Sequence, residues 1–368
     1  MARYELLIDG RSRWKAGSED DARRWLREYC DEHAADDPGA AHVQIRRLSR
    51  WSWLTGGKLV AAQEFLALAL LLMLAGAAPA RAALEPGQTA AVDVSVATLW
   101  KAPNLARPLD RPSLGNPVRP IAWSKNLSTT ASRVWLDAHV QTQALYGQLV
   151  TVLAVRGGWA KVAVRDEPDP QDPRGYPGWL PLRQLKPGFD ARGRYVVAVA
   201  RNAPLLVRGR TLMLSYGTRL HLVRWSGDAA VVRTPDGVGT LSGAEDPLAP
   251  SNASIVAQSK RFLGVHYLWG GLSAWGFDCS GLIWDVYRTH GLTIPRDADP
   301  QFRHGTPVAR AALRSGDLLF FGSPGYAEHV SIYLGGDRML EAPDSAHRVR
   351  IVPVRWTYYI GARRYLTR

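Results

Sequence analysis

Cysteine is scarce in this sequence: its 368 residues contain only two, Cys30 and Cys279. So few thiols exclude a disulfide-stapled scaffold and a zinc site made of several cysteines. No grouping of His, Cys and Asp has the spacing of metal ligands, so we expect neither a metal nor another cofactor. The open question is whether Cys279 is an inert buried side chain or a reactive one.

Long apolar runs are also absent. The apolar run Phe65–Ala80 falls short of the roughly 20 residues that a membrane-spanning helix needs. Basic residues precede it and small residues end it, which is the layout of a signal peptide. We predict a signal peptide or membrane anchor over residues 59–83, preceded by a small α/β segment or an untranslated leader over residues 1–58. The basic flank keeps the N-terminus inside, so we expect everything after Leu84 to be exported to the cell wall or beyond.

Acidic residues are outnumbered: 33 Asp and Glu stand against 46 Lys and Arg, a formal net charge of +13. This balance favours an anionic partner such as a cell-wall polymer, a membrane surface or nucleic acid. The basic residues are spread along the chain and are not clustered with base-stacking aromatics, which argues against nucleic acid. An anionic cell wall is therefore the partner that we expect.

From about residue 92 to 246, short β-rich runs alternate with Gly, Pro and Asp turns, a pattern typical of small barrels. The run beginning at Tyr146-Gly147 is echoed about 70 residues later by the run beginning at Tyr216-Gly217. These repeats resemble paired bacterial SH3-like barrels, which we place at residues 91–190, with an insert, and at 194–246. Three tryptophans in them suit either packing or a platform for sugars or peptides: Trp159, Trp179 and Trp225.

The C-terminal third, residues 252–368, carries the candidate chemistry. One helix is predicted over 252–263, and another begins at Ser280, directly after Cys279, and stops near Gly291. Free N–H groups and the helix dipole stabilise a negatively charged sulfur at such a position. The following runs read as strands, so we predict an α+β domain in which the helix bearing Cys279 packs on an antiparallel sheet.

A thiol nucleophile needs a base, and His329 is the best candidate. It opens a predicted strand in which Ser331 and Tyr333 share its face. The other histidines of this region lie in turn-like settings: His290, His304 and His347.

Several runs in this region are similar to those of the NlpC-type cell-wall peptidase family, in order and at the family's intervals. They are Tyr267–Gly271, Phe277–Leu282, Ile294–Arg296, Gly305–Val308, Gly316–Phe321 and His329–Tyr333. Members of this family are papain-like cysteine peptidases that cut peptidoglycan stem peptides. Paired SH3-like barrels in front of the domain resemble the subgroup that cleaves the γ-D-glutamyl bond to a diamino acid in peptides with a free N-terminal L-Ala.

The resemblance also implies roles for individual residues. Cys279 would be the nucleophile, and His329 the general base that later protonates the leaving amine. Tyr267 matches a tyrosine whose hydroxyl lies near the nucleophile and helps to stabilise the oxyanion. Asp278 and Ser280 match positions that bind the substrate's N-terminal amine.

Glu341 departs from the family pattern, which usually has His, Asn or Gln twelve residues after the base. A carboxylate can accept a hydrogen bond from imidazole Nδ1–H, as in a Ser-His-Asp triad. A three-residue loop after Leu334 would place Glu341 opposite Ser331 and on the face of His329, whereas a two-residue loop would turn it away. Three roles for Glu341 stay open. It orients His329, or it lies on the surface while another residue takes the third catalytic position, or its presence is a sign of weakened or lost catalysis.

The leading hypothesis is an exported cysteine endopeptidase that hydrolyses peptidoglycan stem peptides or muropeptides through a thioester on Cys279. A non-catalytic wall-binding protein, with the barrels as its working part, is the alternative from another class. Acyl or amide transfer on the same thiol is a third hypothesis. The predicted fold is α+β, with two small SH3-like β-barrels before a papain-like domain.

Overall fold

A computed structural model describes residues 84–189 and 192–366, together with four short strands near the N-terminus. The chain forms two units, Met1–Ala83 and Leu84–Arg368. In the first unit, an antiparallel sheet has the order β2-β1-β3-β4, from β1 (Tyr4–Ile8), β2 (Arg11–Ala16), β3 (Val43–Arg47) and β4 (Lys58–Leu59). The rest of the predicted α/β segment, and residues 60–83 of the predicted signal peptide or anchor, lie outside the described residues. Within the described ranges, no helix has the length and apolar character that a membrane crossing requires.

The second unit begins with a seven-stranded antiparallel sheet in the order β11-β5-β8-β9-β10-β6-β7. Alternate residues of its long strands, such as Val150 and Val152, are fully buried, because successive side chains of a strand point to opposite faces. The strands are β5 (Thr89–Val92), β6 (Val96–Trp100), β7 (Val140–Leu145), β8 (Leu149–Arg156), β9 (Trp159–Val164), β10 (Tyr176–Pro181) and β11 (Leu185–Pro187).

A helical insert separates β6 from β7. It contains η1 (Pro108–Ser113), α4 (Pro120–Asn126), α5 (Thr130–Val134) and η2 (Trp135–Ala138), and η3 (Leu182–Gln184) follows β10. Trp159 is buried beneath the insert region, where its Nε1 donates to Asn104 Oδ1 at 2.9 Å. Trp179 packs against the same cluster, so both side chains have a packing role. Trp225, by contrast, is 37% exposed.

A second seven-stranded sheet follows, in the order β14-β13-β17-β16-β15-β12-β18. It encloses a separate apolar core that includes Val196, Leu205, Leu220 and Val232. Its strands are β12 (Tyr195–Ala198), β13 (Asn202–Val207), β14 (Arg210–Ser215), β15 (Arg219–Ser226), β16 (Ala229–Thr234), β17 (Gly237–Leu241) and β18 (Ala244–Glu245).

The tyrosine that opens each repeat packs into the next part of the chain. Tyr146 of the first sheet belongs to the core of the second, and its hydroxyl donates to Asp236 Oδ2 at 3.2 Å. Tyr216 of the second sheet is buried in the C-terminal core, edge-on to Phe262, with its hydroxyl 2.9 Å from Thr289 Oγ1. Each repeat is thereby fixed to its successor, and the three parts share buried contacts.

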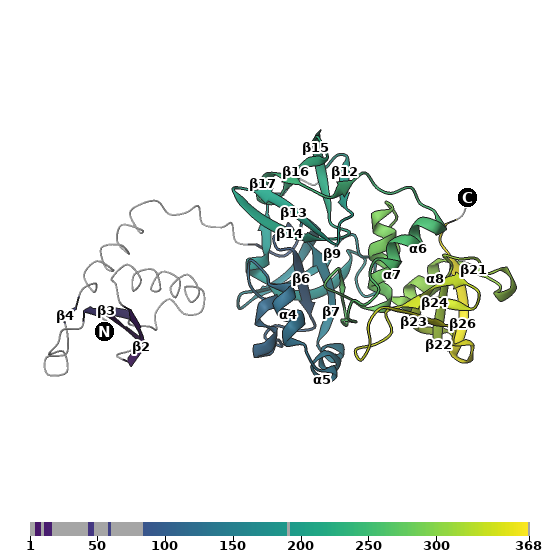
Figure 1. Ribbon diagram of the computed structural model, residues 1–368, viewed down its shortest axis with the longest axis horizontal. Coiled ribbons are helices and arrows are strands. Elements are labelled where there is room, and N and C mark those ends of the chain that lie inside the picture. Colours follow the sequence, from purple (N-terminus) through teal and green to yellow (C-terminus); the bar gives the residue numbers. More distant parts are fainter. Residues whose placement is uncertain are drawn as a thin grey trace. The chain divides into compact units, whose positions relative to one another are not determined.

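The C-terminal part packs helices on a six-stranded antiparallel sheet in the order β21-β26-β22-β23-β24-β25, shown at the yellow end of the colour scale in Figure 1. The helices are α6 (Asn252–Lys260), α7 (Cys279–Thr289) and α8 (Ala298–His304), with short η4 (Arg310–Ala312) and η5 (Trp356–Tyr358). The strands are β21 (Thr306–Val308), β22 (Leu318–Ser323), β23 (Tyr326–Gly335), β24 (Arg338–Glu341), β25 (Arg350–Pro353) and β26 (Tyr359–Arg364), and β19 (Leu272–Ser273) pairs separately with β20 (Gly276–Phe277). The predicted α+β class, with two small barrel sheets before a helix-on-sheet domain, is confirmed.

Candidate active site

Cys279 is the first residue of α7, one position earlier than the predicted start, and is buried with 9% of its surface exposed. Asp278 caps this helix, because its Oδ1 accepts a hydrogen bond from the Gly281 N–H at 2.6 Å. The positive end of the α7 dipole favours negative charge at the same place. The run Asp278–Gly281 therefore puts a free thiol where a thiolate is stabilised.

Arg296 also binds Asp278 and reaches the first turn of α7. Its guanidinium, fully buried, donates to Asp278 Oδ2 at 2.8 Å and Oδ1 at 3.0 Å, and to Ser280 Oγ at 3.0 Å. Its Nε donates to Thr142 Oγ1 at 3.0 Å, which places a contact from the first barrel sheet behind the nucleophile. Burial opposes the charge of Arg296, but Asp278 outweighs burial and raises the pKa of the guanidinium. The motif Ile294–Arg296 does not by itself indicate this contact, because the partner of Arg296 lies 18 residues away.

His329 lies within β23, which begins at Tyr326, so the prediction that His329 opens its strand is wrong by three residues. Its Nε2 is 2.9 Å from Glu341 Oε2, so the carboxylate meets Nε2 and not the Nδ1 that the triad analogy predicted. Burial lowers the pKa of His329, but hydrogen bonds to Cys279 and Glu341 outweigh it and raise the pKa to about 9. The structure therefore joins the predicted nucleophile, base and third residue by hydrogen bonds, in the order Cys279, His329 and Glu341.

A strand irregularity decides where Glu341 points. The hairpin between β23 and β24 pairs Gly335 with Arg338, which leaves a two-residue loop, the length predicted to turn Glu341 away. A register shift between Tyr333 and Gly335 adds one residue on β23, so that Ile332 pairs with Leu340. Such a bulge moves the following side chains to the other face. The bulge therefore gives β24 the same register that a three-residue loop would have given, and Glu341 lies on the face of His329.

Glu341 is enclosed by positive groups. Arg355 Nη1 donates to Oε1 at 2.8 Å and Arg355 Nη2 to Oε2 at 2.5 Å, while Arg350 Nε donates to Oε1 at 3.1 Å. The Glu341 side chain is fully buried, which raises the pKa of a carboxyl, but Arg355 and His329 outweigh burial and hold the pKa well below its usual range. No signal in the sequence singled out Arg355 or Arg350.

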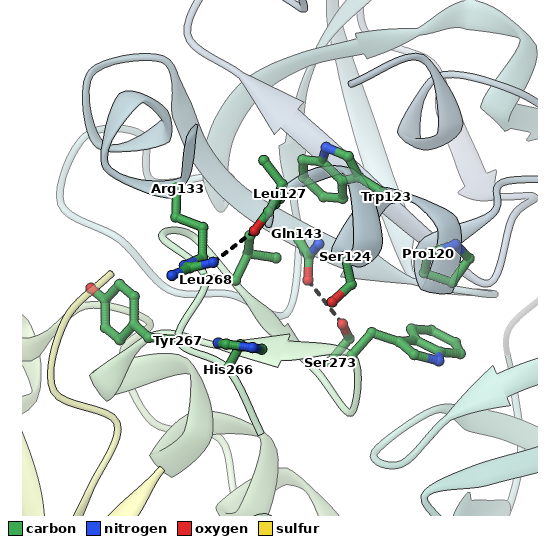
Figure 2. A pocket seen from close by; sticks show the side chains of 11 residues that line it. Pro120, Trp123, Ser124, Leu127, Arg133, Gln143, His266, Tyr267, Leu268 and Ser273 are labelled. Atoms are coloured by element: carbon green, nitrogen blue, oxygen red, sulfur yellow. Dashed lines mark hydrogen bonds between the residues drawn. The ribbon is translucent and has the colours of Figure 1, made fainter. Parts of the chain in front are cut away.

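Tyr267 lies in the segment before α7 and is 5% exposed. Burial raises the pKa of its hydroxyl well above 10, and the nearby Cys279 and Asp278 add to that shift, so the hydroxyl stays protonated and can donate. On one side Tyr267 borders a small cavity, in which Figure 2 shows His266 below Arg133 and Leu127 of the insert, while the Tyr267 ring points away from Leu127. With room of about 20 Å³, that cavity accommodates a single water and no substrate.

A larger pocket, of about 520 Å³, opens beside Cys279. The predicted residues Tyr267, Asp278 and Ser280 line it with the thiol, whereas His329 and Glu341 lie behind the thiol. The first barrel sheet and its loops supply a second wall, made of Lys101, Gln141, Asp169, Pro170, Gln171 and Tyr176. The substrate pocket is therefore shared between two parts of the fold.

The pocket carries an excess of negative charge. Besides Asp278, its lining contains four carboxylates and a single cation: Asp169, Asp297, Asp299, Glu328 and Lys101. Tyr176 donates to Asp297 Oδ2 at 2.8 Å, and burial raises the pKa of Asp297 to about 6 despite the nearby Arg296. The arrangement suits a cationic group on a ligand. In the described parts of the chain, no group of three or more His, Cys, Asp or Glu could hold a metal ion.

A helix-borne thiol, an imidazole held by a carboxylate and a pocket beside them define a papain-like cysteine peptidase site. Residues 264–365 match the model of the NlpC/P60 family, and residues 136–185 match that of the bacterial dipeptidyl-peptidase Sh3 domain. The chain belongs to the NlpC/P60 family, which confirms the resemblance stated from its motifs.

Relatives extend this similarity beyond the peptidase domain. A γ-D-glutamyl-L-lysine dipeptidyl-peptidase of Bacillus cereus is 38% identical over 302 residues, which cover 75% of this chain and 90% of that protein. An enzyme of the same name from Bacillus subtilis is 34% identical over 277 residues, covering 72% of this chain and 93% of the relative. The crystal structure of an NlpC/P60 family protein from Bacillus cereus superposes with a TM-score of 0.73 at 36% identity, covering 76% of this chain and all of that one.

Proposed function

We propose that this protein is a cysteine endopeptidase that hydrolyses peptidoglycan stem peptides at the bond between the γ-D-glutamyl residue and the diamino acid. One observation carries the proposal: Cys279, at the start of α7, lines an acidic pocket and hydrogen-bonds His329, whose Nε2 is held by Glu341. Membership of the NlpC/P60 family and the names of the two Bacillus relatives support the bond and the substrate class.

The residues divide the reaction into two steps. In the first, the Cys279 thiolate attacks the γ-carbonyl carbon, and the Tyr267 hydroxyl faces the developing oxyanion. The C–N bond then breaks as the His329 imidazolium gives its proton to the leaving amine, which leaves a thioester on Cys279. In the second, the neutral imidazole takes a proton from water as the hydroxide adds to the thioester carbonyl. The C–S bond then breaks, which releases the carboxylic acid product and restores the Cys279 thiolate and the His329 imidazolium.

The acidic pocket supports recognition of the substrate's free N-terminal amine. Both oxygens of Asp278 already accept hydrogen bonds from Arg296, so Asp278 and Ser280 contribute as a preorganised polar edge. Asp169, Asp297 and Glu328 provide the negative charge that an ammonium group needs, since Asp299 is already paired with Arg303. Blocking the N-terminus should therefore weaken binding more than it slows the chemical step.

The substrate places the action of this protein at the cell wall. Export through residues 59–83, by a cleaved signal or a retained anchor, remains the prediction from the sequence. The net charge of +13 is compatible with an anionic wall and supplies no mechanism by itself.

Digestion of defined peptides with the full-length chain tests the proposal. We expect L-Ala-γ-D-Glu-L-Lys, or the diaminopimelate counterpart, to yield L-Ala-γ-D-Glu by mass spectrometry, and the N-acetylated peptide to show a higher KM. Cys279→Ala should abolish cleavage, with Cys30→Ala as the matched control that keeps it. Full hydrolysis by Cys279→Ala would exclude the thioester. Wall binding without cleavage by the unaltered chain would favour the non-catalytic alternative.

A further inference from the structure

Glu341 is a buried carboxylate that binds groups from three other elements. Its side chain is fully buried, and its two oxygens accept from His329 on β23, Arg350 on β25 and Arg355 at the start of η5. A buried negative charge is stable only when it is paired and hydrogen-bonded. The imidazole alone does not supply this compensation, because it gives and takes a proton during the reaction.

The two arginines contact Glu341 differently. Arg350 reaches only Oε1, from the residue that pairs with Glu341 across the β24–β25 ladder. Arg355 binds both oxygens, and its 2.5 Å contact is to Oε2, the same oxygen that faces His329 Nε2 at 2.9 Å. A bidentate guanidinium fixes the plane of a carboxylate as well as its charge.

Arg355 is also fixed on its other side. Its guanidinium carbon lies 5.6 Å from the centre of the Phe321 ring, and that ring lies 5.8 Å from the ring of His329. A ring of side-chain contacts therefore surrounds the base: Arg355 contacts Glu341, Glu341 contacts His329, His329 contacts Phe321, and Phe321 contacts Arg355. The Arg355 side chain is 40% exposed, so it is the member of this ring of contacts that solvent reaches.

We propose that Arg355 is a positioning residue of the catalytic site: acting through Glu341, it offsets part of the negative charge of the carboxylate and so limits how strongly Glu341 favours the imidazolium form of His329. The inference rests on the proposed function, because it assigns Arg355 to the base of that reaction. It makes Arg355 a regulator of how strongly the carboxylate favours the imidazolium form.

The charged and titratable groups around this pair determine the sign of the effect. Cys279 on α7 faces the imidazole, and Tyr267 and Asp278 face that thiol in turn. On the far side, Arg350 and Arg355 face Glu341, and Asp344, in the loop after β24, faces both arginines. Removing the charge of Arg355 leaves Glu341 less compensated, so the imidazolium becomes more stable and a weaker acid toward the leaving amine.

The pH dependence of kcat/KM for Arg355→Gln tests the inference. We expect its basic limb to move up by about one pH unit, and kcat at neutral pH to fall about three- to tenfold with KM nearly unchanged. Arg355→Lys keeps the charge without the fork, so its basic limb should stay near that of the wild type. Arg364→Gln is the matched control, because Arg364 makes the same two-point contact, at 2.7 Å each, with the buried Asp317 away from His329.

An independent readout separates this inference from the proposed function. In a Cys279→Ala background, NMR titration of the His329 ring should give a higher pKa with Arg355→Gln than with Arg355, whether or not the chain cleaves any peptide. An unchanged or lowered titration point, or an equal shift in Arg364→Gln, overturns the role of Arg355. If Arg355→Gln and Arg355→Met both fail to fold, Arg355 is a structural residue and the inference is wrong.

Discussion

At the scale of single residues, the third position of the site holds a carboxylate, that of Glu341, where the family resemblance implied His, Asn or Gln. A neutral third residue can orient an imidazole, but only a charged one also favours its protonated form. Glu341 does both, since its Oε2 lies 2.9 Å from His329 Nε2 and the pKa of His329 is raised to about 9. The His329 imidazolium should therefore persist well above neutral pH.

Glu341→Gln reverses this effect. Loss of the negative charge removes a group that raises the pKa of His329, so the basic limb of kcat/KM should move down by about one to two pH units. Activity at pH 8 should fall about two- to tenfold, because only about a half to a tenth of the imidazole remains protonated to serve the leaving amine. Asp317→Asn is the control, as it removes another buried carboxylate of the same domain, one paired with Arg364. An unchanged limb in Glu341→Gln would mean that the carboxylate has no electrostatic effect on the base.

At the scale of elements, the N-terminus of α7 is stabilised by more than an ordinary cap. Ser251 caps α6 through one hydrogen bond, from the Ser254 N–H to its Oγ at 3.1 Å. Asp278 makes the equivalent bond to Gly281 and in addition pairs with the buried Arg296. The helix start that bears the nucleophile is thus joined to the first barrel sheet, since Arg296 also binds Thr142.

Comparing the two caps tests this difference. Ser251→Ala should lower the free energy of unfolding by about 1 kcal/mol, the usual cost of losing a cap. Asp278→Ala should lower it by about 3–5 kcal/mol, because the guanidinium of Arg296 is left buried without its partner. Urea denaturation measures both values. Equal losses would show that the pair with Arg296 adds nothing to the cap.

At the scale of the whole second unit, the tyrosine–glycine turn of each repeat fixes it to the next part of the chain. Gly217 has a φ of +81°, and a Cβ built there would lie 1.6 Å from Asp285 Oδ1 of α7. Arg288 of the same helix donates to the Gly217 carbonyl at 3.2 Å. Only a residue without a side chain lets the second barrel sheet approach the catalytic helix this closely.

Gly217→Ala should therefore destabilise the contact between the second barrel sheet and α7. We expect a loss of more than about 3 kcal/mol, made of roughly 1–2 kcal/mol for the left-handed backbone and the remainder for displacing the fully buried Asp285. Gly209→Ala is the matched control, with a φ of +73° and nothing within 4 Å of its Cβ, and should cost only the backbone term. Similar losses in thermal or urea unfolding would place the effect in the turn and not in the contact.

The sequence by itself determined which residues carry the chemistry and on which elements they lie. The Asp-Cys-Ser-Gly run specifies a capped helix start locally, and the alternation around His329 specifies a strand, because caps and two-residue periodicity depend on near neighbours. The family, the α+β class and the two barrels followed from such local patterns.

Only the tertiary structure decided how those residues meet. The one-residue bulge after Tyr333 turns Glu341 toward His329, and no local pattern marks it, since a bulge is selected by packing across the whole sheet. The partners Arg296, Arg350 and Arg355 lie up to 18 residues from the carboxylates they bind and were not recognised, because a charge reveals its partner only when folding brings both into one buried space.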